Sequence, residues 1–162
     1  LAKHFKAEIA EGLVEFNLIG KMLPNLKNHL NTYVKVSKIG EMILREDFDH
    51  QIITLDYSLF FYDNQFYKLC ASGVFFDAIK FEKPIVALKN DFFDFYFDKL
   101  GNIGYLFSNI EVMIEGIKSI INGECKAEYI IQKHNLRIAK ETLSTDNISL
   151  SFWNQINKYN WY

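Results

Sequence analysis

The sequence contains little proline, little cysteine and no long apolar run. Only two of its 162 residues are proline, and its apolar runs reach a few residues before a charge interrupts them. We therefore expect neither a transmembrane helix nor a signal peptide. The two cysteines, Cys70 and Cys125, are too few for a disulfide framework. These absences predict a reducing, cytoplasmic location, either free or at the inner face of the membrane.

Neither sign of charge is in large excess. The 18 Lys and Arg residues oppose 20 Asp and Glu residues, which gives a formal net charge of -2 without a long run of one sign. Binding to nucleic acid, which needs a basic surface, is not expected. The sequence also lacks the Gly-x-Gly-x-x-Gly dinucleotide fingerprint and the Gly-x-x-x-x-Gly-Lys-Ser/Thr P-loop. Dehydrogenase and NTPase activities thereby lose their main support.

Metal-binding patterns are equally scarce. The four histidines are scattered, with no pair at the spacing of zinc ligands. Asp47-Phe48-Asp49 matches an Asp-x-Asp pattern that can hold a divalent metal, but it falls at the predicted start of an amphipathic helix. Carboxylates at that position stabilise the positive end of the helix dipole. We therefore predict no metal and no cofactor.

What the sequence does contain is the composition of a folded domain with a regular alternation of elements. Hydrophobic residues make up 49% and charged residues 23%, and a domain of this length buries about 70% of the surface of its unfolded chain. The predicted strands are 13–20, 32–36, 57–62, 84–88 and 105–107. The predicted helices are 3–12, 24–30, 41–55, 73–82, 91–100, 109–121, 127–142 and 145–157, and 37–40 is a predicted loop.

This alternation predicts a fold class. Parallel neighbouring strands need crossover connections, so strands that alternate with helices favour a doubly wound, Rossmann-like parallel sheet with helices on both faces. We expect residues 1–162 to form one such domain. Within it, Val74, Ala78 and Ile79 are predicted to face inward, and Phe93, Tyr96 and Phe97 are predicted to form a core-facing stripe.

The most informative segment begins where the strand at 57–62 ends. It continues through a loop to Ser72-Gly73-Val74 at the start of the next helix. A helix start can direct backbone N–H groups and the positive dipole end at a phosphate, and glycine lets that phosphate approach closely. The alternative is that Ser72 only caps its helix and Gly73 only relieves a turn. Asp77, one helical turn after Gly73, could accept hydrogen bonds from ribose hydroxyls or remain a solvated surface acid.

These residues resemble the donor-binding half of GT-B glycosyltransferases. The resemblance runs from about residue 14 to residue 153. It rests on a strand that ends in an aromatic residue, a Ser-Gly at the loop end, an acid-Ala pair on the helix and a Lys-Pro strand after it. In this chain these segments are Asp56-Tyr57-Ser58-Leu59-Phe60-Phe61-Tyr62, Ser72-Gly73-Val74-Phe75-Phe76-Asp77-Ala78 and Lys83-Pro84-Ile85-Val86-Ala87. Phe16-Asn17-Leu18-Ile19-Gly20-Lys21 and Gly101-Asn102-Ile103-Gly104 are similar to two further segments of the family.

The resemblance implies a set of site residues and a substrate. Backbone around Ser72, Gly73 and Val74 would hold the diphosphate of a UDP- or GDP-linked sugar, near Tyr62 at the end of the strand. Asp77 would bind the ribose, and Lys21 would supply a cation against the phosphates. The implied activity is transfer of the sugar to a glycan or lipid-linked acceptor in cell-surface polysaccharide biosynthesis, with peripheral membrane association of the full enzyme.

Two departures from the family pattern qualify this prediction. Retaining members carry two glutamates eight positions apart, whereas Leu69 and Asp77 occupy those positions here, and only Lys68 offers a partial substitute. A GT-B enzyme also joins two such domains. The chain opens on Leu1 rather than Met, so we expect a C-terminal donor-binding domain without its acceptor-binding partner, inactive alone and with unknown catalytic residues. The alternative function is a non-catalytic, flavodoxin-like nucleotide-binding or signalling domain.

Overall fold

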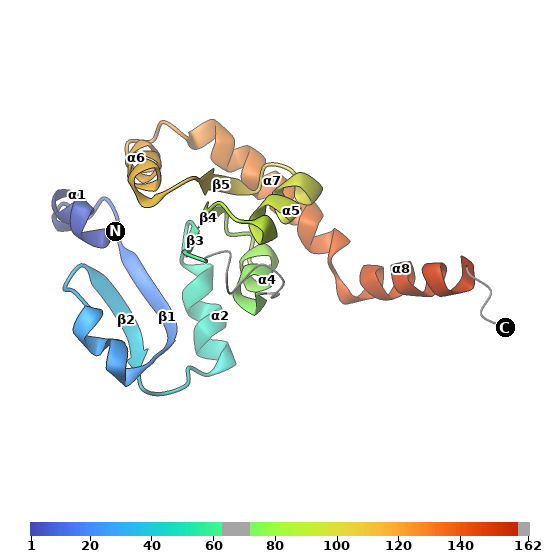
Figure 1. The fold of residues 1–162 in the computed structure, drawn as a ribbon, viewed down its shortest axis with the longest axis horizontal. Helices are drawn as coiled ribbons and strands as arrows, with labels where there is room; N and C mark the ends of the chain where they lie inside the picture. The colour runs from blue at the N-terminus through green and yellow to red at the C-terminus, as the bar shows by residue number, and fades with distance from the viewer. Residues whose placement is uncertain (63–71, 159–162) are drawn as a thin grey trace. The chain divides into compact units, whose positions relative to one another are not determined.

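A computed structural model describes residues 1–62 and 72–158 of the chain (Figure 1). These residues divide into two compact units. Unit 1 contains Leu1–Asp56 and Phe107–Lys126, and unit 2 contains Tyr57–Leu106 and the chain from Ala127 onward. Both units combine helices with parallel strands. The predicted α/β class with parallel strands is thereby confirmed.

Unit 1 is built on a two-stranded parallel sheet. Strand β1 (Phe16–Met22) pairs with β2 (Val34–Ile39), in a register that places Phe16 opposite Val34. The 3-10 helix η2 (Pro24–His29) lies between them in the chain, and α2 (Arg45–Ile53) packs against β1. The unit also contains η1 (Ala2–Phe5), α1 (Lys6–Ala10) and α6 (Ile110–Ile121).

Strand β1 contains an irregularity at a position where the sequence predicts its end. The register shifts between Leu18 and Lys21, and Gly20 has a φ of 122°. This φ suits glycine, which lets the strand bulge and continue. The Ser37 hydroxyl accepts a hydrogen bond from the Gly20 N–H and donates one to the Leu18 carbonyl. The predicted strand end at Gly20 is therefore wrong, because β1 continues to Met22. The predicted loop at 37–40 is wrong for 37–39, because β2 continues to Ile39.

Unit 2 is built on a three-stranded sheet in which the strand order follows the chain. Strand β3 (Ser58–Phe60) pairs with β4 (Ile85–Leu88), and β4 pairs with β5 (Gly104–Phe107). β3 and β4 are parallel, with Ser58 opposite Ile85. The crossover helices are α4 (Gly73–Lys80) and α5 (Asp91–Leu100). Among the described residues the order β3-β4-β5 does not reverse, so the finer prediction of one doubly wound sheet goes beyond what these strands show.

The main hydrophobic core lies in unit 2. It fills the space between the sheet and its helices with side chains from every layer: Phe60, Phe75, Ala78, Ile79, Ile85, Ala87, Phe92, Phe93, Ile103, Leu136 and Ala139. Phe93 is fully buried, and Tyr96 and Phe97 pack against the cluster, which confirms the predicted stripe on α5. On α4 the buried residues are Phe75, Ala78 and Ile79, whereas Val74 is 48% exposed. The inward face of α4 thus starts one residue later than predicted.

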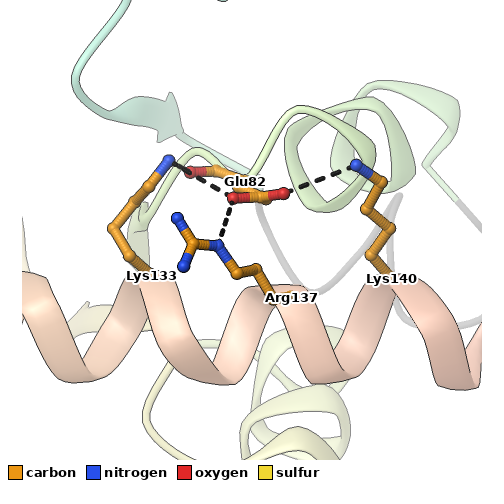
Figure 2. Close-up of polar contacts among 4 residues, drawn as sticks. All are labelled: Glu82, Lys133, Arg137 and Lys140. Atoms are coloured by element: carbon orange, nitrogen blue, oxygen red, sulfur yellow. Dashed lines mark hydrogen bonds and ion pairs between the residues drawn. The ribbon is translucent and has the colours of Figure 1, made fainter.

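Helix α7 (Lys126–Thr142) covers the amino ends of the three strands. The Tyr129 ring lies 5.3 Å from that of Tyr57, which precedes β3. The Asn135 side chain donates to the carbonyl of Asn102, which precedes β5. Glu82, which precedes β4, is bound by three cationic side chains of α7 (Figure 2). Helix α8 (Thr145–Lys158) then follows, and Ser144 caps it by accepting a hydrogen bond from the Asn147 N–H.

Candidate functional site

The carboxyl edge of the sheet in unit 2 brings together the end of β3 and the start of α4. The hydroxyls of Tyr62 and Ser72 share a hydrogen bond of 2.7 Å. The Ser72 hydroxyl also accepts a bond of 3.2 Å from the Phe75 N–H, so Ser72 is the N-cap of α4. The predicted capping role of Ser72 is confirmed. Because Ser72 is nearly buried, the same hydroxyl fixes the position of Tyr62 relative to the helix start.

Asn90 connects this edge to the next crossover. It follows β4 and caps α5, where its side-chain oxygen accepts a 2.9 Å hydrogen bond from the Phe93 N–H. Its side-chain amide donates a 3.2 Å bond to the Tyr62 carbonyl. Only 3% of Asn90 is exposed. One asparagine thus links the chain after β3 to the start of α5, and the positive ends of two helix dipoles meet at one edge of the sheet.

Sequence reasoning missed Asn90, although a signal was present. Asn90-Asp91 follows a buried strand and precedes an apolar helical pattern, and asparagine at such a position is a favoured N-cap. Its second bond, to the Tyr62 carbonyl, joins residues 28 positions apart. That contact depends on the parallel pairing of β3 and β4 and has no local sequence signature.

Aromatic packing holds Tyr62 in place beneath its hydrogen bonds. Its ring stacks on Phe93 at 5.5 Å between centroids, with 19° between the ring planes. Phe60 is a further ring neighbour, whose edge-on contact has a centroid distance of 5.4 Å. Tyr62 is half-buried. Its hydroxyl therefore comes from a side chain whose rotamer is restricted by the core.

The first turn of α4 can present backbone donors to an anion. The first N–H groups of an α-helix have no intrahelical acceptor, and Ser72 accepts one of them, from Phe75. Gly73 and Val74 occupy the first two helical positions and are exposed. A Cβ atom built on Gly73 would meet no atom within 4 Å. Among residues 1–62 and 72–158, the first turn is thus open to a phosphate oxygen, and no atom of these residues requires glycine at this position.

The remaining predicted site residues lie in three different settings. Asp77 is half-buried on α4, one turn after Gly73. Lys21 is exposed in β1 and belongs to unit 1, whereas the other described candidates belong to unit 2. Lys68, Leu69 and Cys70 lie outside the described residues. The roles predicted for Asp77, Lys21 and Lys68 stay predictions.

The acidic pair that matched Asp-x-Asp occupies the first turns of α2. Asp47 lies in the first turn, and Asp49 forms an ion pair of 2.7 Å with Arg45. Across residues 1–62 and 72–158, no group of three or more histidine, cysteine or acidic side chains is placed to hold a metal ion. Within the same residues, no helix combines the length and apolar character needed to cross a bilayer.

Two groups with a shifted pKa are not among the predicted site residues. Burial raises the pKa of Tyr96, which packs against the core of unit 2. In unit 1, hydrogen bonds from Lys35 and then from Asn17 lower the pKa of Glu15. These groups have structural partners, so neither is a candidate acid or base for the proposed site.

Comparison with known proteins gives no relative from which a function could be transferred: no family model, curated protein or solved structure matches the chain.

Proposed function

We propose that the chain is the donor-binding domain of a GT-B glycosyltransferase and that it binds a nucleoside-diphosphate sugar at the start of α4. One observation carries the proposal. Tyr62, Ser72 and Asn90 join the end of β3, the start of α4 and the start of α5 at the carboxyl edge of a parallel sheet. Sheets of this kind bind ligands at that edge.

In this proposal the diphosphate lies against the N–H groups of Gly73 and Val74. The dipoles of α4 and α5 stabilise its negative charge without a metal ion. Asp77, which follows one turn later on α4, accepts hydrogen bonds from the ribose hydroxyls. The acceptor would be a glycan or a lipid-linked sugar held by a second domain, so the chain alone binds the donor and does not transfer the sugar.

Thermal unfolding in the presence of nucleotides tests the proposal. A ligand at one hundred times its dissociation constant stabilises the folded state by about 2.7 kcal/mol, which raises Tm by about 5–10 °C in a chain of this size. We expect UDP or GDP to produce such a shift at millimolar concentration and the nucleosides uridine and guanosine to produce none. Absence of a shift with UDP, GDP and ADP would contradict nucleotide binding.

Replacement of Asp77 tests the position of the ribose. Asp77→Ala is expected to weaken UDP or GDP binding by at least about tenfold, because a hydrogen bond to a charged group contributes about 1.5–3 kcal/mol. The matched control is Asp98→Ala, which removes an exposed carboxylate from α5 and should leave affinity unchanged. Circular dichroism checks that both variants fold. If both variants bind UDP or GDP as tightly as the parent chain, Asp77 is not part of the binding site.

A further inference from the structure

Helix α8 exposes large apolar side chains along its whole length. It has 14 residues and none of them is buried. Ile148, Leu150, Phe152 and Trp153 are between 52% and 60% exposed. Isolated helices of about 12–15 residues are marginally stable in water, and most helices in proteins gain their stability by packing an apolar face. The described part of the chain buries no residue of α8, so a packed partner would have to come from elsewhere.

Four of the five large apolar residues of α8 lie on one side of the helix, whereas the fifth, Leu150, lies about 160° around the helix axis from Phe152. Ile148, Phe152 and Ile156 are spaced by four residues and therefore form one stripe, which Trp153 extends along its flank. Most other positions carry serine, asparagine or glutamine. Asp146, near the start, and Lys158, at the end, are the charged residues of this helix. Apart from Leu150, the rest of the helix surface is thus polar and almost uncharged.

The distribution of charge favours a particular partner. Helices that lie on lipid surfaces carry many Lys and Arg residues on their polar face, and α8 has one cation. In contrast, the Ile148, Phe152 and Ile156 stripe and the two charged residues of α8 are arranged symmetrically about Phe152. Ile148 and Ile156 lie four residues to either side, and Asp146 and Lys158 lie six residues to either side. In an antiparallel pair of α8 helices, Ile148 of each helix would therefore face Ile156 of the other, and the two Phe152 side chains would face each other.

We propose that α8 is a self-association surface that pairs with α8 of a second copy of this chain, antiparallel and centred on Phe152. The pair is isologous, so every contact except the central one between the two Phe152 side chains is made twice. The acidic end of each helix lies at the level of the basic end of the other, and the two helix dipoles oppose each other. At about 1.5 Å per residue the helix is about 21 Å long. This is short for a stable interface, so the dimer is expected to be weak and dependent on concentration.

Sedimentation equilibrium of the full chain tests self-association. Between about 1 µM and about 1 mM, the mean mass should rise from that of a monomer toward that of a dimer. Phe152→Gln should weaken the association by at least about tenfold, because symmetry removes both aromatic rings of the central contact. Asn154→Gln, on the opposite side of the helix, is the control and should dimerise like the parent. A monomeric parent chain over the whole range would overturn the proposal, whether or not the same chain binds to lipid vesicles.

Disulfide trapping tests the register and orientation. It uses chains in which Cys70 and Cys125 are replaced by serine, with circular dichroism as a check of folding. Phe152→Cys should then form a disulfide-linked dimer on mild oxidation. Ile148→Cys alone should not, but a mixture of Ile148→Cys and Ile156→Cys chains should. If Ile148→Cys chains form disulfide-linked dimers with each other, the helices pair in parallel. If Phe152→Cys chains form dimers no faster than Asn154→Cys chains, the helices form no specific pair. Either result would overturn the proposal.

Discussion

At the scale of single residues, Gly73 distinguishes the two explanations of the α4 start. Its φ is not in the left-handed region, and a Cβ built on it would meet no atom within 4 Å. The backbone conformation therefore does not need glycine there, and neither does packing against the described residues. A phosphate that contacts the N–H groups of the first turn would require glycine at this position, because a Cβ atom would block its approach.

Gly73→Ala should therefore separate stability from binding. The variant is expected to be about 0.5 kcal/mol more stable, because alanine restricts the unfolded chain more than glycine does. Its affinity for UDP or GDP should fall by about tenfold, equivalent to about 1.4 kcal/mol. Denaturant unfolding and calorimetric titration measure the two effects. The control is Gly12→Ala, where φ is 73°, so stability should fall and affinity should not change. If Gly73→Ala binds as tightly as the parent, the phosphate does not lie at this residue.

The capping role of Ser72 could be predicted from the local sequence, whereas the contacts that join it to distant residues could not. A serine before an apolar helical pattern indicates an N-cap, and the structure confirms that role. The hydrogen bond between Tyr62 and Ser72 and the bridge from Asn90 to Tyr62 depend on which strands pair. The prediction that Val74 faces inward was wrong for a different reason. Its i,i+4 spacing to Ala78 suited an inward face, but Phe75 took the buried position because it fills the core.

At the scale of elements, an unusual residue fastens α7 to the sheet. Glu82 has a φ of 54°, a conformation that costs most residues energy. Its backbone carbonyl accepts a 2.7 Å hydrogen bond from Lys133. Its carboxylate contacts Arg137 at 3.0 Å and Lys140 at 3.4 Å, and lies 3.8 Å from Lys133 (Figure 2). One acidic residue in a strained turn thus receives three cations from three successive turns of the same helix.

The titration of Glu82 gives this attachment a definite pH dependence. Partial burial raises its pKa, but the hydrogen bonds from Arg137 and Lys140 and the charges of Lys133 and Lys140 outweigh it, so the pKa lies below its ordinary value of 4.5. The native state therefore binds the proton more weakly than the unfolded chain does. The resulting stabilisation is complete above about pH 5.5 and is lost as the pH falls through the folded-state pKa.

Glu82→Gln should reveal that contribution. The variant keeps the size of the side chain and loses its charge, so at pH 7 it should be less stable than the parent by about 1–2 kcal/mol, an amount limited by the solvent exposure of Arg137 and Lys140. At pH 3 the difference should largely disappear. Urea unfolding at both pH values measures it. Glu115→Gln, which removes an exposed pair with Lys118, is the control and should change stability by less than about 0.5 kcal/mol. A difference between parent and Glu82→Gln that is equally large at both pH values would show that the charge of Glu82 is not its cause.

At the scale of the whole molecule, the class of fold followed from the sequence more readily than the arrangement of its sheets. Helix α5 lies at its predicted bounds of 91–100, because an amphipathic pattern and Gly101 mark it locally. The alternation of strands and helices likewise indicated parallel pairing. The described strands form two sheets rather than one. Which strands join is decided by contacts between distant segments, and a chain with five short apolar runs does not specify them locally.

The unequal burial of the two sheets predicts unequal resistance to local unfolding. In unit 2, Ile85, Val86 and Ala87 of β4 are buried, and β4 is bonded to a strand on each side. In unit 1, β1 buries Met22 but leaves most of its residues exposed or half-exposed, and its sheet has two strands. A sheet of two strands is marginally stable without further packing.

Amide hydrogen exchange at neutral pH should therefore be at least about a hundredfold faster in β1 and β2 than in β4. Saturating UDP or GDP should slow exchange near the start of α4 more than in β2, because the proposed phosphate contacts belong to unit 2. Equal protection of β1 and β4 without nucleotide would mean that the chain unfolds as one cooperative unit, and that the two compact units do not open separately.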